Sequence, residues 1–359
     1  MSNTWGKNLH LTIFGESHGA GVGMVLEGLP AGLCLDEAFL AAQLKRRRAG
    51  RPGTTQRKET DEFRWLGGVR DGYTIGTPVC AFFPNQDVRS ADYAFDFWRP
   101  SHADYTNEIK YHGQGDSRGG GQASGRMTAP LVLAGALCAL ALWEHYDIQA
   151  ASHIERLGSY TEPRFSMQPE RDCLAALAAS ELPCLLPEGP EAVRRVIAEA
   201  QEAQDSVGGL AETILVGIPA GWGDPFFQSV ESRLAQLLFS VPGVKGVSFG
   251  AGFSLAEMKG SPAHECFVWK DGRVQTRTNH SGGLQGGITN GMPLVFETVM
   301  KPTPSIGKSQ KTLGRDGTEV ERTIRGRHDA CILLRAIPAL EACAWLALYD
   351  AWKGRNEHA

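Results

Sequence analysis

The stretch TAPLVLAGALCALALWEHY, residues 128–146, is apolar along most of its length. Thr128 is a suitable N-cap residue and Pro130 fits the first turn, so the stretch predicts an α-helix. Because apolar side chains lie on every face of this helix, every face must be buried. RAIPALEACAWLALYDAW, which starts at Arg335, predicts a second helix of the same kind. Two such helices indicate a layered interior in which sheets cover the helices on more than one side.

Strands, hairpins and ordinary helices surround these two stretches. Apolar runs predict strands at HLTIFG, VGMVLEG, GTPVCAFF, ETILVGIP and MPLVFETVM, which are residues 10–15, 22–28, 76–83, 212–219 and 292–300. Turn residues predict hairpins around Asp271-Gly272 and Asp316-Gly317. Helices are predicted at 37–48, 190–204 and 229–241, the first capped by Asp36. This mixture favours an α+β fold in a single domain, residues 1–359, with segment 158–190 as a surface excursion.

The composition is that of a soluble globular protein. Of the 359 residues, 42% are hydrophobic and 21% are charged, and the net charge is −4. This charge provides no basic surface for nucleic acid or for an anionic membrane. The first residues lack the apolar core of a signal peptide, and the longest apolar run, 131–143, is shorter than the roughly 18 residues that span a bilayer. We therefore expect a cytoplasmic protein that binds neither membrane nor nucleic acid.

Eight cysteines occur in the chain, and no two form a CxxC motif. Most lie in apolar surroundings, so we expect buried free thiols in a reducing compartment and no disulfide framework. Neither cysteine nor histidine spacing matches a zinc ligand set, so no metal site is predicted.

A glycine-rich loop, GDSRGGGQASGR at residues 115–126, comes directly before the first apolar helix. Two nucleotide-binding motifs are excluded by spacing: Arg118 stands where a dinucleotide fingerprint needs its third glycine, and Pro302 stands at the first glycine of a P-loop. Backbone amides at a helix start and the guanidiniums of Arg118 and Arg126 favour anion binding. By composition alone, a tight packing turn fits this loop about equally well.

Four other segments carry groups suited to anions. They are KRRRAGRPGTTQRK (45–58), NHSGGLQGGITNG (279–291), KPTPS (301–305) and RGRHDA (325–330). Each alone is also compatible with a solvated helix end or a tight turn. In a chain with a net charge of −4, their combination predicts a site for a multiply charged anion.

Two histidines in predicted loops are candidates for proton transfer. His18 lies in GESHG just after a predicted strand, and His102 lies in RPSHADYT near Arg99 and Asp104. A lone loop histidine is more often structural than catalytic. Two histidines beside anion-binding arginines nevertheless suit acid–base chemistry, whereas a serine hydrolase is unsupported because no GxSxG motif is present.

Three longer motifs closely resemble the chorismate synthase family: GESHGAGVGMVLEGLP, GQASGRMTAPLVLAGAL and RHDACILLRAIPALEAC. RPSHADYT, DSVGG, NHSGGLQGGI and KPTPSI occur between them in the family's order. The resemblance implies a sandwich of long buried helices between antiparallel sheets, assembled as a homotetramer. It also implies the last step of the shikimate pathway to aromatic amino acids. In that step, anti 1,4-elimination of phosphate from 5-enolpyruvylshikimate 3-phosphate gives chorismate, with dependence on reduced FMN.

The resemblance assigns roles to individual residues. His18 would protonate the departing phosphate, and His102 would act on the reduced flavin. Asp329 would assist flavin N5 in taking the proton from C6, with supporting hydrogen bonds from Ser17 and Ser124. Arginines would hold the anions of the substrate: Arg47, Arg48, Arg51, Arg126 and Arg335. The flavin would contact Gln122, Ala123, Ser124, Gly243, Gly286, Lys301, Pro302, Thr303, Pro304, Ser305 and Arg327.

The sequence departs from the family pattern in the glycine-rich loop. Gln122 stands where an arginine is common, and Met127 stands where a glutamate usually follows the arginine. The two differences remove one positive and one negative charge, which is compatible with a compensated change of two side chains that could pair. The loop after Arg48 is slightly shorter than usual, which leaves the match of Arg51 open.

Two other functions compete with the enzyme. The first is a non-catalytic protein of the same fold that binds flavin or an organic phosphate; the presence of His18, His102, Arg327 and Asp329 disfavours it. The second is a nucleic-acid module, which rests on KRRR alone and is disfavoured by the net charge. No NAD(P)H fingerprint or additional domain is visible, so we expect an external flavin reductase to supply the reduced flavin.

Overall fold

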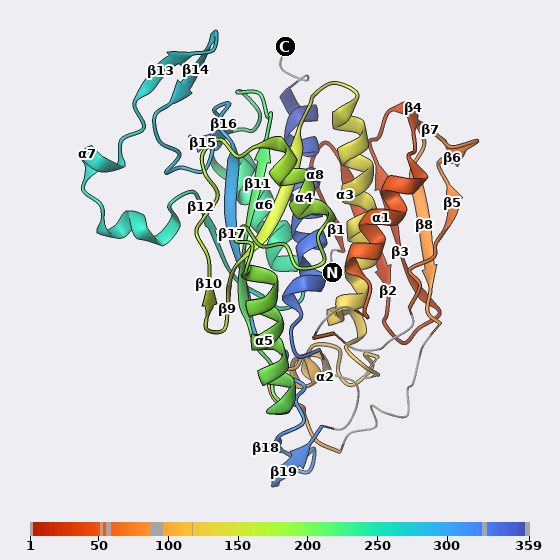
Figure 1. Cartoon of the computed structure of the whole chain (residues 1–359). Helices are drawn as coiled ribbons and strands as arrows, with labels where there is room; N and C mark the ends of the chain where they lie inside the picture. The colour runs from red at the N-terminus through yellow and green to blue at the C-terminus, as the bar shows by residue number, and fades with distance from the viewer. Residues whose placement is uncertain are drawn as a thin grey trace.

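Two five-stranded sheets enclose a layer of helices (Figure 1). The structure is a computed structural model that describes residues 3–50, 53–54, 59–86, 96–116, 118–324 and 329–355. Arg51 and Arg327 of the predicted site lie outside the described residues. The predicted α+β architecture, with long buried helices between antiparallel sheets, is confirmed.

The first sheet is antiparallel and has the strand order β1-β2-β3-β8-β5. Its strands are β1 (Thr4–Trp5), β2 (His10–Gly15), β3 (Gly21–Glu27), β8 (Val79–Pro84) and β5 (Arg64–Gly67). A separate three-stranded sheet contains β4 (Ala31–Cys34), β7 (Tyr73–Ile75) and β6 (Val69–Arg70). The predicted strands at 10–15, 22–28 and 76–83 therefore belong to one sheet.

The second sheet has the order β10-β9-β11-β17-β12. Its strands are β10 (Tyr160–Thr161), β9 (Gln149–Leu157), β11 (Gly209–Val216), β17 (Leu294–Met300) and β12 (Val244–Phe249). Ala211 and Leu215 of β11 belong to the main core, whereas Ile214 packs against Leu174 and Leu177. Because side chains alternate along a strand, one face of this sheet meets the central helices and the other meets α4 (Arg171–Ala179).

The central layer is built on α3 (Thr128–Trp143) and α8 (Leu333–Arg355), which pack against each other. At Gly135, an added Cβ would lie 2.4 Å from the Cβ of Ala342 and 2.5 Å from its Cα. Only glycine permits this approach, because real Cβ atoms do not come so close to neighbouring atoms. α1 (Glu37–Arg47) and α6 (Val230–Ser240) flank the pair.

The apolar composition of α3 follows from its position. The stretch Gly125–Trp143 has the length and hydropathy of a membrane-spanning helix, but 83% of it is buried inside the protein. Core helices with this composition are common in globular proteins, so the stretch does not indicate a membrane span.

The remaining elements are shorter or lie at the periphery. They are α2 (Asp104–Lys110), α5 (Gly189–Glu202), α7 (Gly260–Ala263), β13 (Phe267–Lys270), β14 (Arg273–Thr276), β15 (Leu284–Gln285), β16 (Ile288–Thr289), β18 (Ser309–Leu313) and β19 (Glu319–Thr323). α7 and the β13–β14 hairpin stand away from the body of the molecule (Figure 1). Both predicted hairpins are confirmed, with Asp271 at φ 52° and Gly317 at φ 85° in their turns.

The predicted N-cap of the first apolar helix is wrong. Thr128 is the first residue of α3, and a 3₁₀ turn, Gly125–Met127, precedes it. Ser124 caps this turn, since its Oγ accepts a hydrogen bond from the Arg126 amide at 3.2 Å. The Thr128 hydroxyl instead donates to the Gly125 carbonyl at 2.7 Å. Because an additional turn lies between the loop and the helix, the capping residue is Ser124, four residues before the predicted Thr128.

The burial predicted for the cysteines is only partly correct. All eight cysteines are free thiols, and Cys138, Cys331 and Cys343 are buried. Cys34, Cys173 and Cys266 are exposed. Cys34 lies at the end of the short strand β4, Cys173 lies in the peripheral helix α4, and Cys266 lies just before β13, so none of the three is enclosed by the core.

The predicted surface excursion, segment 158–190, covers the second sheet through buried ionic contacts. His153, Glu212 and Glu297 lie opposite one another on β9, β11 and β17. Arg164 of the excursion donates to Glu212 at 2.9 Å and pairs with Glu297 at 3.1 Å. Burial alone would lower the pKa of His153, but its hydrogen bonds to Glu162 and Glu212 raise it above the ordinary value.

The stability of this region should depend on pH through Glu155. Burial and the carboxylates of Glu297 and Glu212 raise its pKa to about 7, against the attraction of Arg164. Because its pKa is raised, the folded state favours the protonated carboxyl. The contribution of Glu155 to the unfolding free energy is therefore fully present below about pH 4.3, its pKa in the unfolded chain, and is lost as the pH rises through about 7. We expect Glu155→Gln to flatten the fall in unfolding free energy between pH 5 and pH 8, measured by urea denaturation. Glu181→Gln, at an exposed site, is the control, and an unchanged slope in Glu155→Gln would contradict the assignment.

The contact between α3 and α8 predicts a steric effect at Gly135. Gly135→Ala should lower the unfolding free energy by about 1–3 kcal/mol, because the new methyl group overlaps the Ala342 backbone. Thermal and urea denaturation measure the change. Gly67→Ala is the matched control, because an added Cβ there meets nothing within 4 Å.

Candidate active site

A cavity of about 560 Å³ lies where β2, α1, the glycine-rich loop, the end of β17 and the start of α8 converge. Most predicted site residues line it: Ser17, His18, Arg47, Arg48, His102, Ala123, Ser124, Arg126, Gly243, Lys301, Thr303, Pro304, Ser305, Asp329 and Arg335. The fold therefore brings segments from both ends of the chain to one place, as a small-molecule site of this size requires.

Three predicted flavin contacts do not line this cavity. Gln122 is exposed, and Pro302 is exposed beside lining residues. Gly286 lies in the turn between β15 and β16, at φ 63°, where an added Cβ meets nothing within 4 Å. Contact of these residues with flavin stays a prediction.

His18 is held between its neighbour in sequence and the glycine-rich loop. Its Nδ1 lies 3.0 Å from Ser17 Oγ, and both side chains are buried. A Cβ on Gly119, which has φ 61°, would lie 2.2 Å from His18 Cε1. The loop thus needs glycine at this position so that its backbone can lie directly against the imidazole.

Arg99 joins the loop of His102 to the glycine-rich loop that lies against His18. Its guanidinium pairs with Asp104 through bonds of 2.8 and 2.6 Å, and it also donates to the Gly119 carbonyl at 2.6 Å. Burial raises the pKa of Asp104, but Arg99 and the charge of His102 outweigh it and hold that pKa below its ordinary value. Arg99 was not a predicted site residue, although its place in RPSHAD three residues before His102 was a usable signal.

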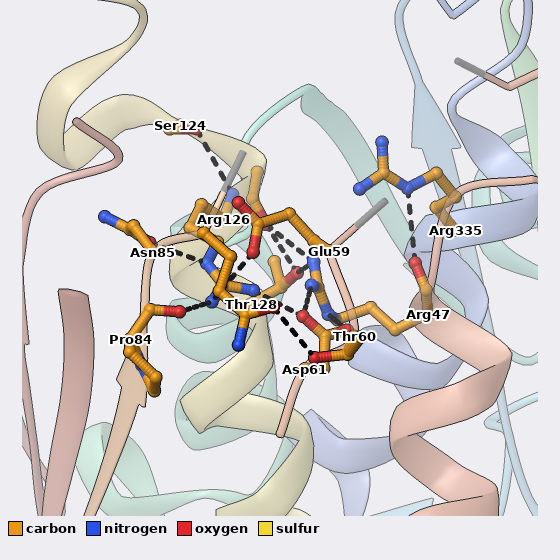
Figure 2. A network of polar contacts seen from close by, with 12 residues as sticks. Arg47, Glu59, Thr60, Asp61, Pro84, Asn85, Ser124, Arg126, Thr128 and Arg335 are labelled. Carbon is orange, nitrogen blue, oxygen red and sulfur yellow. Dashed lines mark hydrogen bonds and ion pairs between the residues drawn. The ribbon is translucent and has the colours of Figure 1, made fainter. Parts of the chain in front are cut away.

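A buried carboxylate, Asp61, organises one wall of the cavity (Figure 2). Arg47 donates to it through Nε at 3.1 Å and Nη2 at 2.6 Å, and Arg126 donates to it through Nη1. Arg126 also donates to Asn85 Oδ1 at 3.0 Å and to the Pro84 carbonyl at 3.1 Å. Most donors of both arginines are therefore used within the protein, which favours a wall-forming role over direct anion binding.

The sequence did not single out Asp61 or Glu59, which lines the cavity 3.6 Å from Arg126. Their signal was a group of three carboxylates in KETDEF directly after an arginine-rich segment. Asp61 has φ 51°, a conformation that Asp and Asn adopt more readily than most residues.

Other cations at the cavity are better placed to meet an anion. Arg48 has a buried Nε with no hydrogen-bond partner among the described residues, and Arg335 donates to Asp329 at 2.8 Å. On the opposite side, Lys301 and Lys245 both line the cavity. Burial and the nearby charge of Lys245 lower the pKa of Lys301. Lys245 was missed in the sequence because a single exposed lysine on a strand carries no motif.

The model of the chorismate synthase family matches residues 9–352 of this chain. The chain belongs to the chorismate synthase family. A chorismate synthase of Thermococcus gammatolerans is 43% identical over 361 residues, which covers 97% of this chain and 99% of the relative. One of Pyrococcus abyssi is 42% identical over 352 residues, which covers 96% of each. A crystal structure of chorismate synthase has a TM-score of 0.76 at 31% identity and covers 97% of this chain and 92% of that chain.

These comparisons confirm the family resemblance seen in the motifs, and chorismate synthases are lyases. Within the family, the two departures of this chain occupy different surroundings. Gln122 is exposed, whereas Met127 is buried in the main core at the start of α3. The replacement at 127 therefore adds an apolar side chain to the core, and a compensated loss of the two charges stays a prediction.

The Asp61 network predicts a large loss of stability when its charge is removed. Asp61→Asn leaves two buried guanidiniums without their carboxylate and should cost about 3–5 kcal/mol in unfolding free energy. Asp71→Asn is the matched control: Asp71 also has positive φ, and it pairs with Arg70 at the surface. Denaturation of both variants measures the difference. Equal losses of unfolding free energy would show that Arg47 and Arg126 do not depend on the charge of Asp61.

Proposed function

We propose that the protein catalyses the anti 1,4-elimination of phosphate from 5-enolpyruvylshikimate 3-phosphate to give chorismate, with dependence on reduced FMN. In this reaction the C–O bond to phosphate breaks, a proton leaves C6 and a new double bond forms, without net oxidation. The observation that carries the proposal is one cavity lined by His18, His102 and Asp329 together with several cations, in a member of the chorismate synthase family.

His18 would deliver the proton to the departing phosphate. Ser17 Oγ occupies the Nδ1 side of the imidazole at 3.0 Å, so we assign proton delivery to Nε2. Arg48 and Arg335 would bind the negative charges of the substrate, which carries one phosphate and two carboxylates. Asp329, hydrogen-bonded to Arg335, would receive or relay the proton lost from C6.

The residues of the cavity fit a flavin phosphate. Lys301 supplies a cation, and Thr303 presents a buried hydroxyl that has no hydrogen-bond partner among the described residues. Lys301, Thr303 and Ala123 would hold the cofactor, and Ser124 would support it. Reduced FMN, when bound, would lend electron density to the substrate as the C–O bond breaks. We further propose that an external reductase supplies the reduced flavin and that the enzyme works in the cytoplasm as a homotetramer.

Anaerobic turnover tests the proposal. Chorismate absorbance should appear when the protein is mixed with 5-enolpyruvylshikimate 3-phosphate and dithionite-reduced FMN, and it should not appear with oxidised FMN or without flavin. His18→Ala should lower kcat by about 10²- to 10⁴-fold, because a positioned general acid is lost. His264→Ala, at an exposed site directly after α7, is the control.

Two results would contradict the proposed function. Tight flavin binding without any chorismate would point to a non-catalytic binding protein of the same fold. Turnover with NADPH and FMN under air, with no reductase added, would overturn the proposed need for an external reductase.

A further inference from the structure

The segment 301–305 contacts the loop of His102 at two points, although about 200 residues separate them in the chain. Ser305 Oγ lies 2.6 Å from His102 Nε2. Lys301 Nζ donates to the Ser101 carbonyl at 2.8 Å. The family resemblance assigns both residues to flavin, but in this structure each already has a partner in the histidine loop.

The segment is anchored firmly enough to orient a side chain. Its first amide, on Lys301, donates to the Gly243 carbonyl at 2.9 Å, and the Thr303 carbonyl accepts from Ser206 Oγ at 2.7 Å. Pro302 and Pro304 restrict the backbone between these bonds. The Ser305 side chain is buried, so its hydroxyl has few alternative positions.

The loop of His102 needs such support. Ser101 has φ 57°, which is unfavourable for a residue other than glycine. The imidazole is only half-buried, so packing alone does not restrict its rotation as it would in a core. Among the residues that the structure describes, the charged groups near it are Asp104 and Arg99 on its own loop and Lys301 on the facing segment.

A hydroxyl suits this position because it both donates and accepts. Ser305 can donate to Nε2 of a neutral imidazole and accept from Nε2–H of a protonated one, so one bond persists through a protonation cycle. An active-site base oriented by a third group is a general feature of acid–base sites.

We propose that Ser305 is a positioning residue for His102. Its hydroxyl fixes the plane of the imidazole through Nε2 and so directs Nδ1 to exchange protons with the bound reactants. The expected kinetic effect rests on the proposed function. The hydrogen bond itself joins two residues of the protein and needs neither flavin nor substrate.

The experiment combines histidine NMR with kinetics. In ¹⁵N-labelled, flavin-free protein, Ser305→Ala should move the Nε2 resonance of His102 and its pH titration, and Ser305→Thr should restore both. In turnover, Ser305→Ala should lower kcat by about 10- to 100-fold with a much smaller change in KM, because a misplaced proton-transfer group mainly slows chemistry. The pH profile of kcat should move with it. Ser309→Ala, at the exposed start of β18, is the control.

The outcomes separate this inference from the proposed function. If flavin affinity falls in Ser305→Ala while the His102 resonances stay unchanged, Ser305 is a flavin contact only and the inference fails. If wild-type protein gives no chorismate, the proposed function fails, and the NMR arm still tests the hydrogen bond. If Ser305→Ala does not fold, the wild-type spectrum decides: an Nε2 shift typical of a hydrogen-bonded nitrogen supports the inference, and the shift of a free, rapidly exchanging ring overturns it.

Discussion

The candidate active site depends on one carboxylate that is shared by two guanidiniums. Asp61 lies among the least exposed polar residues and binds Arg47 at the end of α1 and Arg126 in the turn before α3. A charge buried so deeply is tolerated only when it is paired and hydrogen-bonded, so each of the three groups requires the other two. This mutual requirement fixes the distance between α1 and the glycine-rich loop and leaves the neighbouring Arg48 and Arg335 to meet a ligand.

The opposite side of the cavity is built on different contacts. Arg99 connects the loop of His102 to Gly119, whose backbone lies against His18, and segment 301–305 connects the same loop to the second sheet. Each histidine thus contacts one segment that is remote from it in sequence, Gly119 for His18 and Ser305 for His102. The cavity consequently has one wall set by buried ion pairs and another set by hydrogen bonds between loops.

Features that arise from local patterns could be predicted from the sequence. The apolar faces of α3 and α8 predicted the layered fold, and Asp36 caps α1 as predicted. The motifs around His18 and His102 predicted two of the loops that line the cavity. Partnerships across the fold could not be predicted, because nothing in the sequence near Arg47 or Arg126 shows that both would be paired with Asp61. Ser124 replaced Thr128 as the capping residue for a related reason, since a short 3₁₀ turn leaves no periodic pattern.

The contact between α3 and α8 has a consequence for how the protein is made. α3 is apolar on all sides, and its main helical partner, α8, is encoded about 190 residues later. At a synthesis rate of roughly 5–20 residues per second, α3 waits on the order of ten seconds or more before α8 exists. During that time α1 and the first sheet can already cover part of α3, but the face that later packs on α8 has no partner in the nascent chain. Synthesis therefore includes a period in which this apolar face is open to aggregation.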